Sequence, residues 1–246
     1  MRHRLIYLFL LSLKAFARLF YRHDVAWIST TAADDPWQPF RVIAVLNHTS
    51  LLEWLLAGSV PNRLLRRIAY HAVVPVADKT LDRPLVGRFF RFISPTCLRI
   101  TREADHTWQN VLEEIDEDSM LIIFPEGRMK RANGLDKNGR PMTVRGGIAD
   151  ILRAHEDGPL LIAYSGGMHH IQVPGRLPRL FKTVRLRLEG TEIEAYRRSI
   201  GEDLPTVQFK RAVRSDLERR RDIYCPPLEE AAGIRYPPPP TADVES

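Results

Sequence analysis

Cysteine is scarce in this chain. Its 246 residues include two cysteines, Cys97 and Cys225, which lie far apart in the sequence and lack neighbours at metal-ligand spacing. A disulfide-stabilised domain needs several pairs, and a structural zinc site needs four ligands at short spacings, so the sequence indicates neither. We expect no metal, and a reducing cytoplasmic setting is the default for such a composition.

An uninterrupted hydrophobic run is lacking at the N-terminus. Charges interrupt the apolar residues of MRHRLIYLFLLSLKAFARLFYRH too often for a spanning segment. At about 100° per residue, the cations Arg4, Lys14, Arg18 and Arg22 share an arc of about 80° on a helix. We therefore expect residues 1–29 to form an amphipathic helix at a membrane interface, with its cations toward lipid phosphates. The alternatives are a signal peptide, against which Lys14 argues, and a helix packed on its own domain.

Positive charge is in excess. Lysine and arginine total 36 against 30 aspartates and glutamates, for a formal net charge of +6. This balance favours an anionic partner, either nucleic acid or phospholipid headgroups. Nucleic acid is disfavoured because the basic residues belong to no RNA- or DNA-binding module, so we expect membrane phospholipid.

Short apolar runs alternate with helical patterns along the chain. Strand-like runs occupy residues 41–46, 71–76, 97–101, 120–124, 159–164 and 183–189, and helical patterns occupy 50–58, 84–93, 105–117, 146–155 and 205–221. The alternation predicts a single α/β domain over residues 40–224, with a mostly parallel or mixed central sheet flanked by helices. Alternating polarity in TVRLRLE (183–189) predicts an edge or half-exposed strand. A loop (30–39) precedes the domain, and a flexible proline-rich tail (225–246) follows it.

The segment NHTSLLEW, residues 47–54, has a histidine directly after a predicted strand and a carboxylate five positions later. Positions five apart on one helix lie roughly 140° apart, so His48 and Glu53 meet only if the helix begins between them. Ser50 and Glu53 fit a capping box, in which the glutamate folds back toward the preceding residues. We predict that His48 is a general base that Glu53 orients. The alternative is that Glu53 only caps the helix.

A second motif, FPEGRMK, spans residues 124–130 and follows another predicted strand. It lies at the edge of the sheet where α/β proteins bind ligands. Gly127 permits close backbone approach, and Arg128 and Lys130 offer cations to a phosphate. Taken by itself, the motif could be an ordinary turn followed by a solvated basic run.

Together, NH-x4-E, the segment from Gly87 to Arg102 and FPEGR resemble the glycerolipid acyltransferase superfamily, typified by 1-acylglycerol-3-phosphate acyltransferases, over roughly residues 40–165. The resemblance implies an O-acyltransferase that moves a fatty acyl group from acyl-CoA or acyl carrier protein to a lysophospholipid or glycerol-phosphate-like hydroxyl. No cofactor is implied. His48 and Glu53 match the family's catalytic histidine-x4-aspartate pair, with glutamate in place of aspartate. The expected location is the cytoplasmic face of a membrane, as a peripheral or monotopic protein.

The resemblance also implies substrate-binding positions: Asn47, Ser50, Gly87, Arg102, Phe124, Pro125, Glu126, Gly127, Arg128 and Lys130. Arg102 and Arg128 would hold the acceptor phosphate, while Glu126 would brace the site or bind a second hydroxyl. The family's FPEGTRS block has arginine where this chain has Met129, so its phosphate-binding role passes to Arg128 or Lys130.

Three other functions remain open from the sequence. A histidine-x4-glutamate pair also occurs in acyltransferases that act on saccharide lipids. A serine hydrolase would use Ser165 in AYSGG, but MHHIQVPGRLP follows this segment and does not favour the helix that a nucleophile elbow requires. A membrane-binding relative without catalysis is the third. The basic segment at residues 210–221 could bind headgroups or the acidic carrier, although a solvated helix face is the more usual interpretation.

Overall fold

The computed structural model describes residues 1–31, 35–77, 81–82, 84, 87–88, 92, 96–100, 115–116, 118–155, 157–173 and 176–227. Within these ranges, the named helices are α1 (Arg2–Phe20), the 3-10 helix η1 (Leu51–Ser59), α2 (Asn62–His71), α6 (Gly147–Ala154), α7 (Ile193–Ile200) and α8 (Thr206–Tyr224). The strands are β1 (Arg22–Ser29), β2 (Val42–Leu46), β3 (Ala72–Ala77), β4 (Thr96–Ile100), β5 (Met120–Ile123), β6 (Pro159–Ser165) and β7 (Thr183–Glu192).

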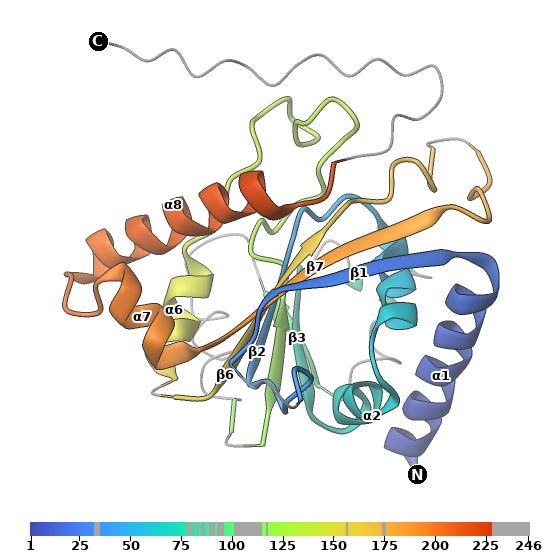
Figure 1. Cartoon of the computed structure of the whole chain (residues 1–246), viewed down its shortest axis with the longest axis horizontal. Helices are drawn as coiled ribbons and strands as arrows, with labels where there is room; N and C mark the ends of the chain where they lie inside the picture. Colours follow the sequence, from blue (N-terminus) through green and yellow to red (C-terminus); the bar gives the residue numbers. More distant parts are fainter. Residues whose placement is uncertain are drawn as a thin grey trace.

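The strands form one seven-stranded mixed sheet in the order β1-β7-β6-β2-β5-β3-β4 (Figure 1). All neighbouring pairs are parallel except β6 and β7. The carboxyl ends of β2, β5 and β6 therefore lie at the same edge, where the loops that follow them can meet. The predicted single α/β domain, with six strands at the expected places, is confirmed.

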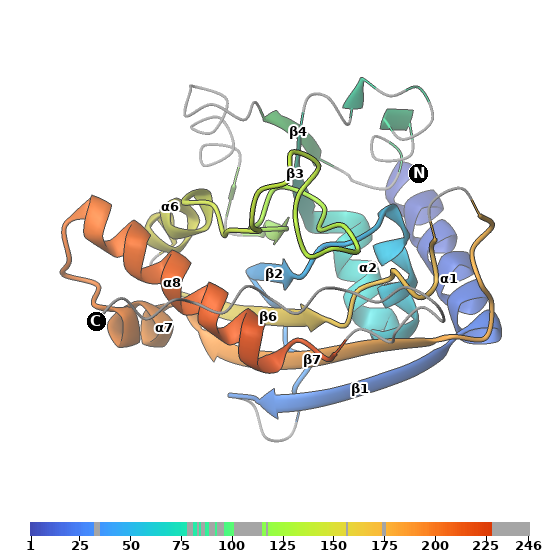
Figure 2. The same ribbon diagram turned by 90° about the horizontal axis from the view of Figure 1, so that it is seen from above.

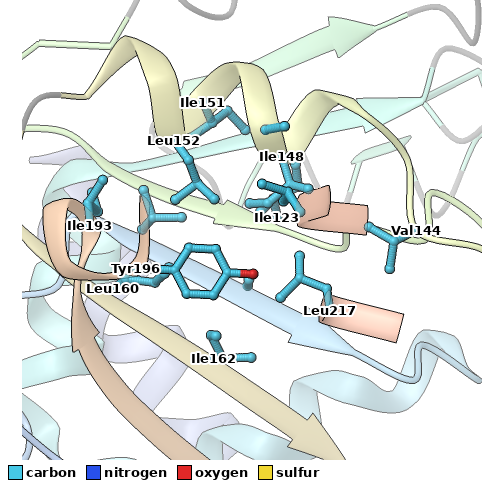
Figure 3. Close-up of a cluster of buried hydrophobic side chains, with 14 of the residues drawn as sticks. Ile123, Val144, Ile148, Ile151, Leu152, Leu160, Ile162, Ile193, Tyr196 and Leu217 are labelled. Atoms are coloured by element: carbon cyan, nitrogen blue, oxygen red, sulfur yellow. The ribbon is translucent and has the colours of Figure 1, made fainter. Parts of the chain in front are cut away.

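Helices cover both faces of the sheet. Figures 1 and 2 show α6, α7 and α8 on one side and α1 and α2 on the other. In β2, Val42 and Leu46 point toward the first group of helices, whereas Ile43 and Val45 point toward the second. Figure 3 shows the first of these cores, in which β6 residues meet side chains of α6 and α8. Burial on both faces explains why these strands are continuous apolar runs.

The N-terminal helix is shorter than the predicted 1–29. Helix α1 ends at Phe20, and β1 follows it and pairs with β7 in parallel. Val25, Trp27 and Ile28 favour an extended backbone, but their partner strand lies near the other end of the chain, so local periodicity does not reveal the pairing. β7 is consequently an interior strand. Its predicted edge position is wrong, whereas its alternating burial confirms a half-exposed strand.

The orientation predicted for Lys14, one of the cations of α1, is wrong. Lys14 is buried, and its ammonium donates to Val60 O at 2.7 Å and Asn62 Oδ1 at 2.6 Å. Arg18 Nε donates to Gly58 O at 3.0 Å. The carbonyl oxygens at the end of η1 carry partial negative charge and therefore attract these cations. Burial lowers the pKa of Lys14, and the nearby charge of Arg18 lowers it further. Lys14 and Arg18 are therefore bonded to the domain, whereas the other two cations of the predicted arc are exposed.

The opposite face of α1 leaves Leu5, Leu8, Phe16 and Leu19 exposed. Among the described residues, none of the helices has the length and hydropathy to cross a bilayer.

The predicted helical segments 50–58, 146–155 and 205–221 correspond to η1, α6 and α8, while α2 and α7 were not predicted. The segment 105–117, much of 84–93 and the tail beyond residue 227 lie wholly or largely outside the described residues.

Candidate active site

The chain turns sharply at the carboxyl end of β2. Asn47 has a φ of 64°, in the left-handed region that asparagine tolerates better than most residues. Its side-chain amide donates to Ser165 O at 2.8 Å, which joins the end of β2 to the end of β6. This turn directs the next residue, His48, to the ligand-binding edge of the sheet.

The predicted capping box is present at the start of η1. Ser50 Oγ accepts from Leu52 N at 3.0 Å, and Glu53 Oε1 accepts from Thr49 N at 2.7 Å and Ser50 N at 3.2 Å. The other carboxylate oxygen, Glu53 Oε2, lies 2.5 Å from His48 Nδ1. Glu53 thus caps the helix with one oxygen and holds the imidazole with the other.

The surroundings of His48 favour its protonated form. Burial alone would lower the pKa of His48, but the charge and hydrogen bond of Glu53, together with the charge of Glu126, outweigh burial and raise it. The imidazole ring packs against Phe124, with ring centroids 4.7 Å apart. Because Nδ1 faces Glu53, Nε2 is the nitrogen that remains for proton exchange with a ligand.

Glu126, in the second motif, holds the backbone of His48. It has no exposed surface; its Oε2 accepts from His48 N at 2.9 Å, and its Oε1 accepts from Arg221 Nη1 at 3.2 Å. Gly127 adopts a φ of 60°, which allows the chain to turn immediately after this carboxylate. Both oxygens of Glu126 are bonded to protein, so Glu126 braces the loop of His48, and its contact with a substrate hydroxyl stays a prediction.

Arg221 was not identified from the sequence as part of this site. Its side chain is 11% exposed and also donates to Met142 O at 3.0 Å. Buried Phe209, Val213 and Leu217 recur every four residues along α8, and Arg221 is the next position in this series. The spacing could have indicated that Arg221 lies on the buried face, so the interpretation of residues 210–221 as a solvated face is wrong for Arg221.

A sequence profile described as Acyltransferase matches residues 35–165, more than half of the chain. The chain belongs to the acyltransferase family. No curated protein matches it. Among solved structures, it is similar to the crystal structure of the 1-acyl-sn-glycerophosphate (LPA) acyltransferase PlsC from Thermotoga maritima, with a TM-score of 0.50 and 17% identity over 85% of this chain and 78% of that one. Identity this low shows a shared fold, and with the profile it confirms the predicted superfamily.

The predicted phosphate-binding cations of the acyltransferase differ in their surroundings. The Arg128 guanidinium pairs with Asp136, whose carboxylate also accepts from the backbone amides of Arg140 and Asn138. These bonds lower the pKa of Asp136 to about 2, with the Arg140 amide contributing most. Arg128 is therefore committed to its own loop. Lys130 N donates to His48 O at 2.7 Å, and no ion pair of the Lys130 ammonium is recorded within the described residues.

Four further positions predicted to contact the substrate of the acyltransferase are buried. Asn47 and Ser50 have almost no exposed surface, and Ser50 Oγ donates to Gln172, so both residues position the loop, and their contact with a substrate stays a prediction. Pro125 is also buried, and its carbonyl accepts from Arg145 N at 2.8 Å. Gly87 is buried, whereas Arg102 lies outside the described residues.

The hydrolase alternative finds no support at Ser165. The side chain of Ser165 is fully buried, and its Oγ accepts from Gly167 N at 3.0 Å. Turns follow β6, where a nucleophile elbow would lead into a helix. This serine therefore serves the local structure of the acyltransferase.

Proposed function

We propose that this acyltransferase moves a fatty acyl group from a thioester donor, acyl-CoA or acyl carrier protein, to a hydroxyl of a lysophospholipid or glycerol-phosphate-like acceptor. The observation that carries the proposal is the 2.5 Å contact between His48 Nδ1 and Glu53 Oε2 at the carboxyl edge of the sheet. A carboxylate on one imidazole nitrogen is the arrangement that makes the other nitrogen an effective general base.

In the proposed reaction, His48 Nε2 takes the proton of the acceptor hydroxyl. The acceptor oxygen then forms a bond with the thioester carbonyl carbon, the carbon–sulfur bond breaks, and the departing thiolate takes the proton from the imidazolium. Glu53 stabilises that imidazolium while it exists. General base catalysis of this kind contributes about 10²- to 10⁴-fold, and positioning of the two substrates adds to it. No cofactor takes part.

Phosphate recognition is assigned to residues beside this pair. Two observations support Lys130 as a phosphate-binding residue: its backbone N donates to His48 O, and its ammonium forms no ion pair within the described residues. Arg128 can bind a phosphate only if its pairing with Asp136 rearranges or is shared. Arg102 remains part of the proposal from the family resemblance.

The proposed location is the cytoplasmic face of a membrane, with the protein attached peripherally. The exposed leucines and phenylalanine of α1 support this attachment, because they are the face that the domain does not cover. Each CH₂ group moved from water to an apolar environment contributes about 0.8 kcal/mol. An acyltransferase with a long-chain acceptor therefore operates best where that acceptor already resides.

The test is His48→Ala, assayed with labelled acyl donors and a panel of lysolipids, with products identified by mass. We expect a loss of about 10²- to 10⁴-fold in acyl transfer. His71→Ala is the matched control, because His71 precedes β3 at the opposite edge of the sheet and should leave the rate unchanged. Full activity of the His48 variant would eliminate the proposed base.

A saccharide lipid acceptor is the second candidate, because the acid of the pair is Glu53. The same panel should include an under-acylated saccharide lipid, and the mass of the product decides between the two acceptors. A serine-reactive fluorophosphonate should leave the protein unlabelled. Labelling at Ser165 would favour a hydrolase.

A further inference from the structure

The loop of residues 176–182, sequence RLPRLFK, exposes apolar and basic side chains together. Leu177 is 89% exposed, Phe181 is 65% exposed and Leu180 is 42% exposed. Three cations alternate with these apolar residues: Arg176, Arg179 and Lys182. Within the described residues, these cations form no ion pair. Single exposed apolar residues are ordinary, but three within five positions form a patch that calls for a partner.

This loop, which we call the 176–182 loop, adjoins the carboxyl end of α1. Phe181 N donates to Phe20 O at 2.7 Å, Arg22 N donates to Lys182 O at 3.0 Å, and the rings of Phe20 and Phe181 lie 6.2 Å apart. Figures 1 and 2 both show the loop, in orange, beside the end of α1 from which β1 starts. The exposed apolar face of α1, which ends at Leu19, is therefore continued by a second segment far away in the sequence.

The backbone of the loop is held in an unusual conformation. Phe181 has a φ of 60°, a left-handed value that bulky side chains rarely adopt. Residues held in such regions cluster at ligand clamps and other functional positions. The strained residue here also exposes most of its aromatic ring to solvent. Burial of that ring would have stabilised the fold.

The loop is also linked to the candidate active site. It follows the turn of residues 168–172, in which Met168 N donates to Thr49 Oγ1 at 2.7 Å and Gln172 accepts from Ser50. Arg179 N returns to this turn and donates to Ile171 O at 2.8 Å. A surface bound at the 176–182 loop would thus lie one short turn away from the residues that position His48.

We infer that the 176–182 loop is a second membrane contact, which inserts Leu177, Leu180 and Phe181 into a bilayer while its cations bind anionic headgroups. Alternating cations and large apolar groups suit a lipid interface, where phosphates and acyl chains lie within one side-chain length of each other. An apolar surface of a partner protein would offer no negative charge to the three cations. Two anchors, α1 and the loop, would define the plane in which the acyltransferase approaches its lipid.

The test measures binding of the purified full chain to sedimenting vesicles of phosphatidylcholine, alone or mixed in equal parts with phosphatidylglycerol. We expect Leu177→Ser/Phe181→Ser to weaken binding at least tenfold. The control is Val207→Ser/Ile223→Ser on α8, where the two side chains are 79% and 58% exposed. This control should bind as the unaltered chain does.

A second variant separates lost binding from lost folding. Glycine tolerates a positive φ, so Phe181→Gly should keep or raise the unfolding temperature and yet weaken vesicle binding. Replacing Arg176, Arg179 and Lys182 by glutamine should remove the preference for anionic vesicles. Retention of that preference by the glutamine variant would overturn the role of the cations.

Three results would overturn the inference as a whole: unchanged binding of the serine variant, no binding of the unaltered chain, or a loop-dependent dimer in sedimentation analysis with vesicle binding unaffected. The vesicle assay does not depend on acyl transfer. Failure of the proposed function would appear instead as the absence of acylated product from every acceptor, whatever the loop does.

Discussion

Replacing Arg221 by methionine should destabilise the protein through a single buried carboxylate. Glu126 has no exposed surface, and the Arg221 side chain is 11% exposed. Methionine fills most of the space of the arginine stem but leaves the charge of Glu126 without its cation. Removing one partner of a buried ion pair costs about 3–5 kcal/mol. For a domain of this size, that cost lowers the unfolding temperature by about 6–20 °C.

The same substitution should reduce turnover. Glu126 Oε2 holds the backbone amide of His48, so movement of the carboxylate would displace the imidazole from its contact with Glu53. Misplacement of a reacting group by about 1 Å can cost on the order of 10²-fold in rate. We expect a loss of this size in turnover, assayed below both unfolding midpoints, with a smaller effect on the acceptor KM.

Thermal unfolding followed by circular dichroism, with two comparison variants, tests this reasoning. Arg219 lies on the same helix, its side chain is 57% exposed, and its partner Asp216 keeps a second cation, Arg220, so Arg219→Met should cost less than about 1 kcal/mol. Adding Glu126→Gln to Arg221→Met removes the unpaired charge and should recover part of the lost stability. If Arg221→Met unfolds at the temperature of Arg219→Met and retains its turnover, Arg221 does not hold the site together.

Glu53→Gln should lower turnover more than Glu53→Asp, because the carboxylate charge matters more than its reach; equal steady-state rates would leave Glu53 as a helix cap alone. Burial would lower the pKa of His48, but Glu53 and Glu126 raise it above 6.5, so the neutral base forms only toward higher pH. The rate should therefore rise with pH through this raised pKa, and Glu53→Gln should move the rise to lower pH. Lys14→Met should cost about 1–3 kcal/mol in denaturant unfolding, because Val60 O loses its buried donor; an unchanged midpoint would contradict this anchoring of α1.

Much of the fold was predictable because its signals are local. The strands β2 and β5 are buried on both faces, and complete burial leaves a continuous apolar run that can be recognised without knowing the neighbouring strands. The capping box was predictable for a similar reason: Ser50 and Glu53 lie within one turn, and the cap itself brings the carboxylate back to His48. The contact between His48 and Glu53 thus follows from eight consecutive residues.

Periodicity shows which side chains share a face, but not what that face contacts. The cations of α1 share one arc, as predicted, yet the tertiary structure turns Lys14 toward a carbonyl oxygen and leaves Leu5, Leu8 and Leu19 exposed. β1 was not predicted for a similar reason, because its partner strand β7 lies far away in the sequence.

The amino-acid sequence alone determined the class of fold, the pairing of His48 with Glu53 and the edge of the sheet where that pair lies, because each depends on neighbours along the chain. Only the tertiary structure decided that Arg221 neutralises Glu126, that Arg128 is committed to Asp136, and that the 176–182 loop extends the apolar face of α1. The first and third of these contacts join segments that lie far apart along the backbone, so no local pattern in the sequence reveals them, whereas Arg128 and Asp136 pair within one short loop.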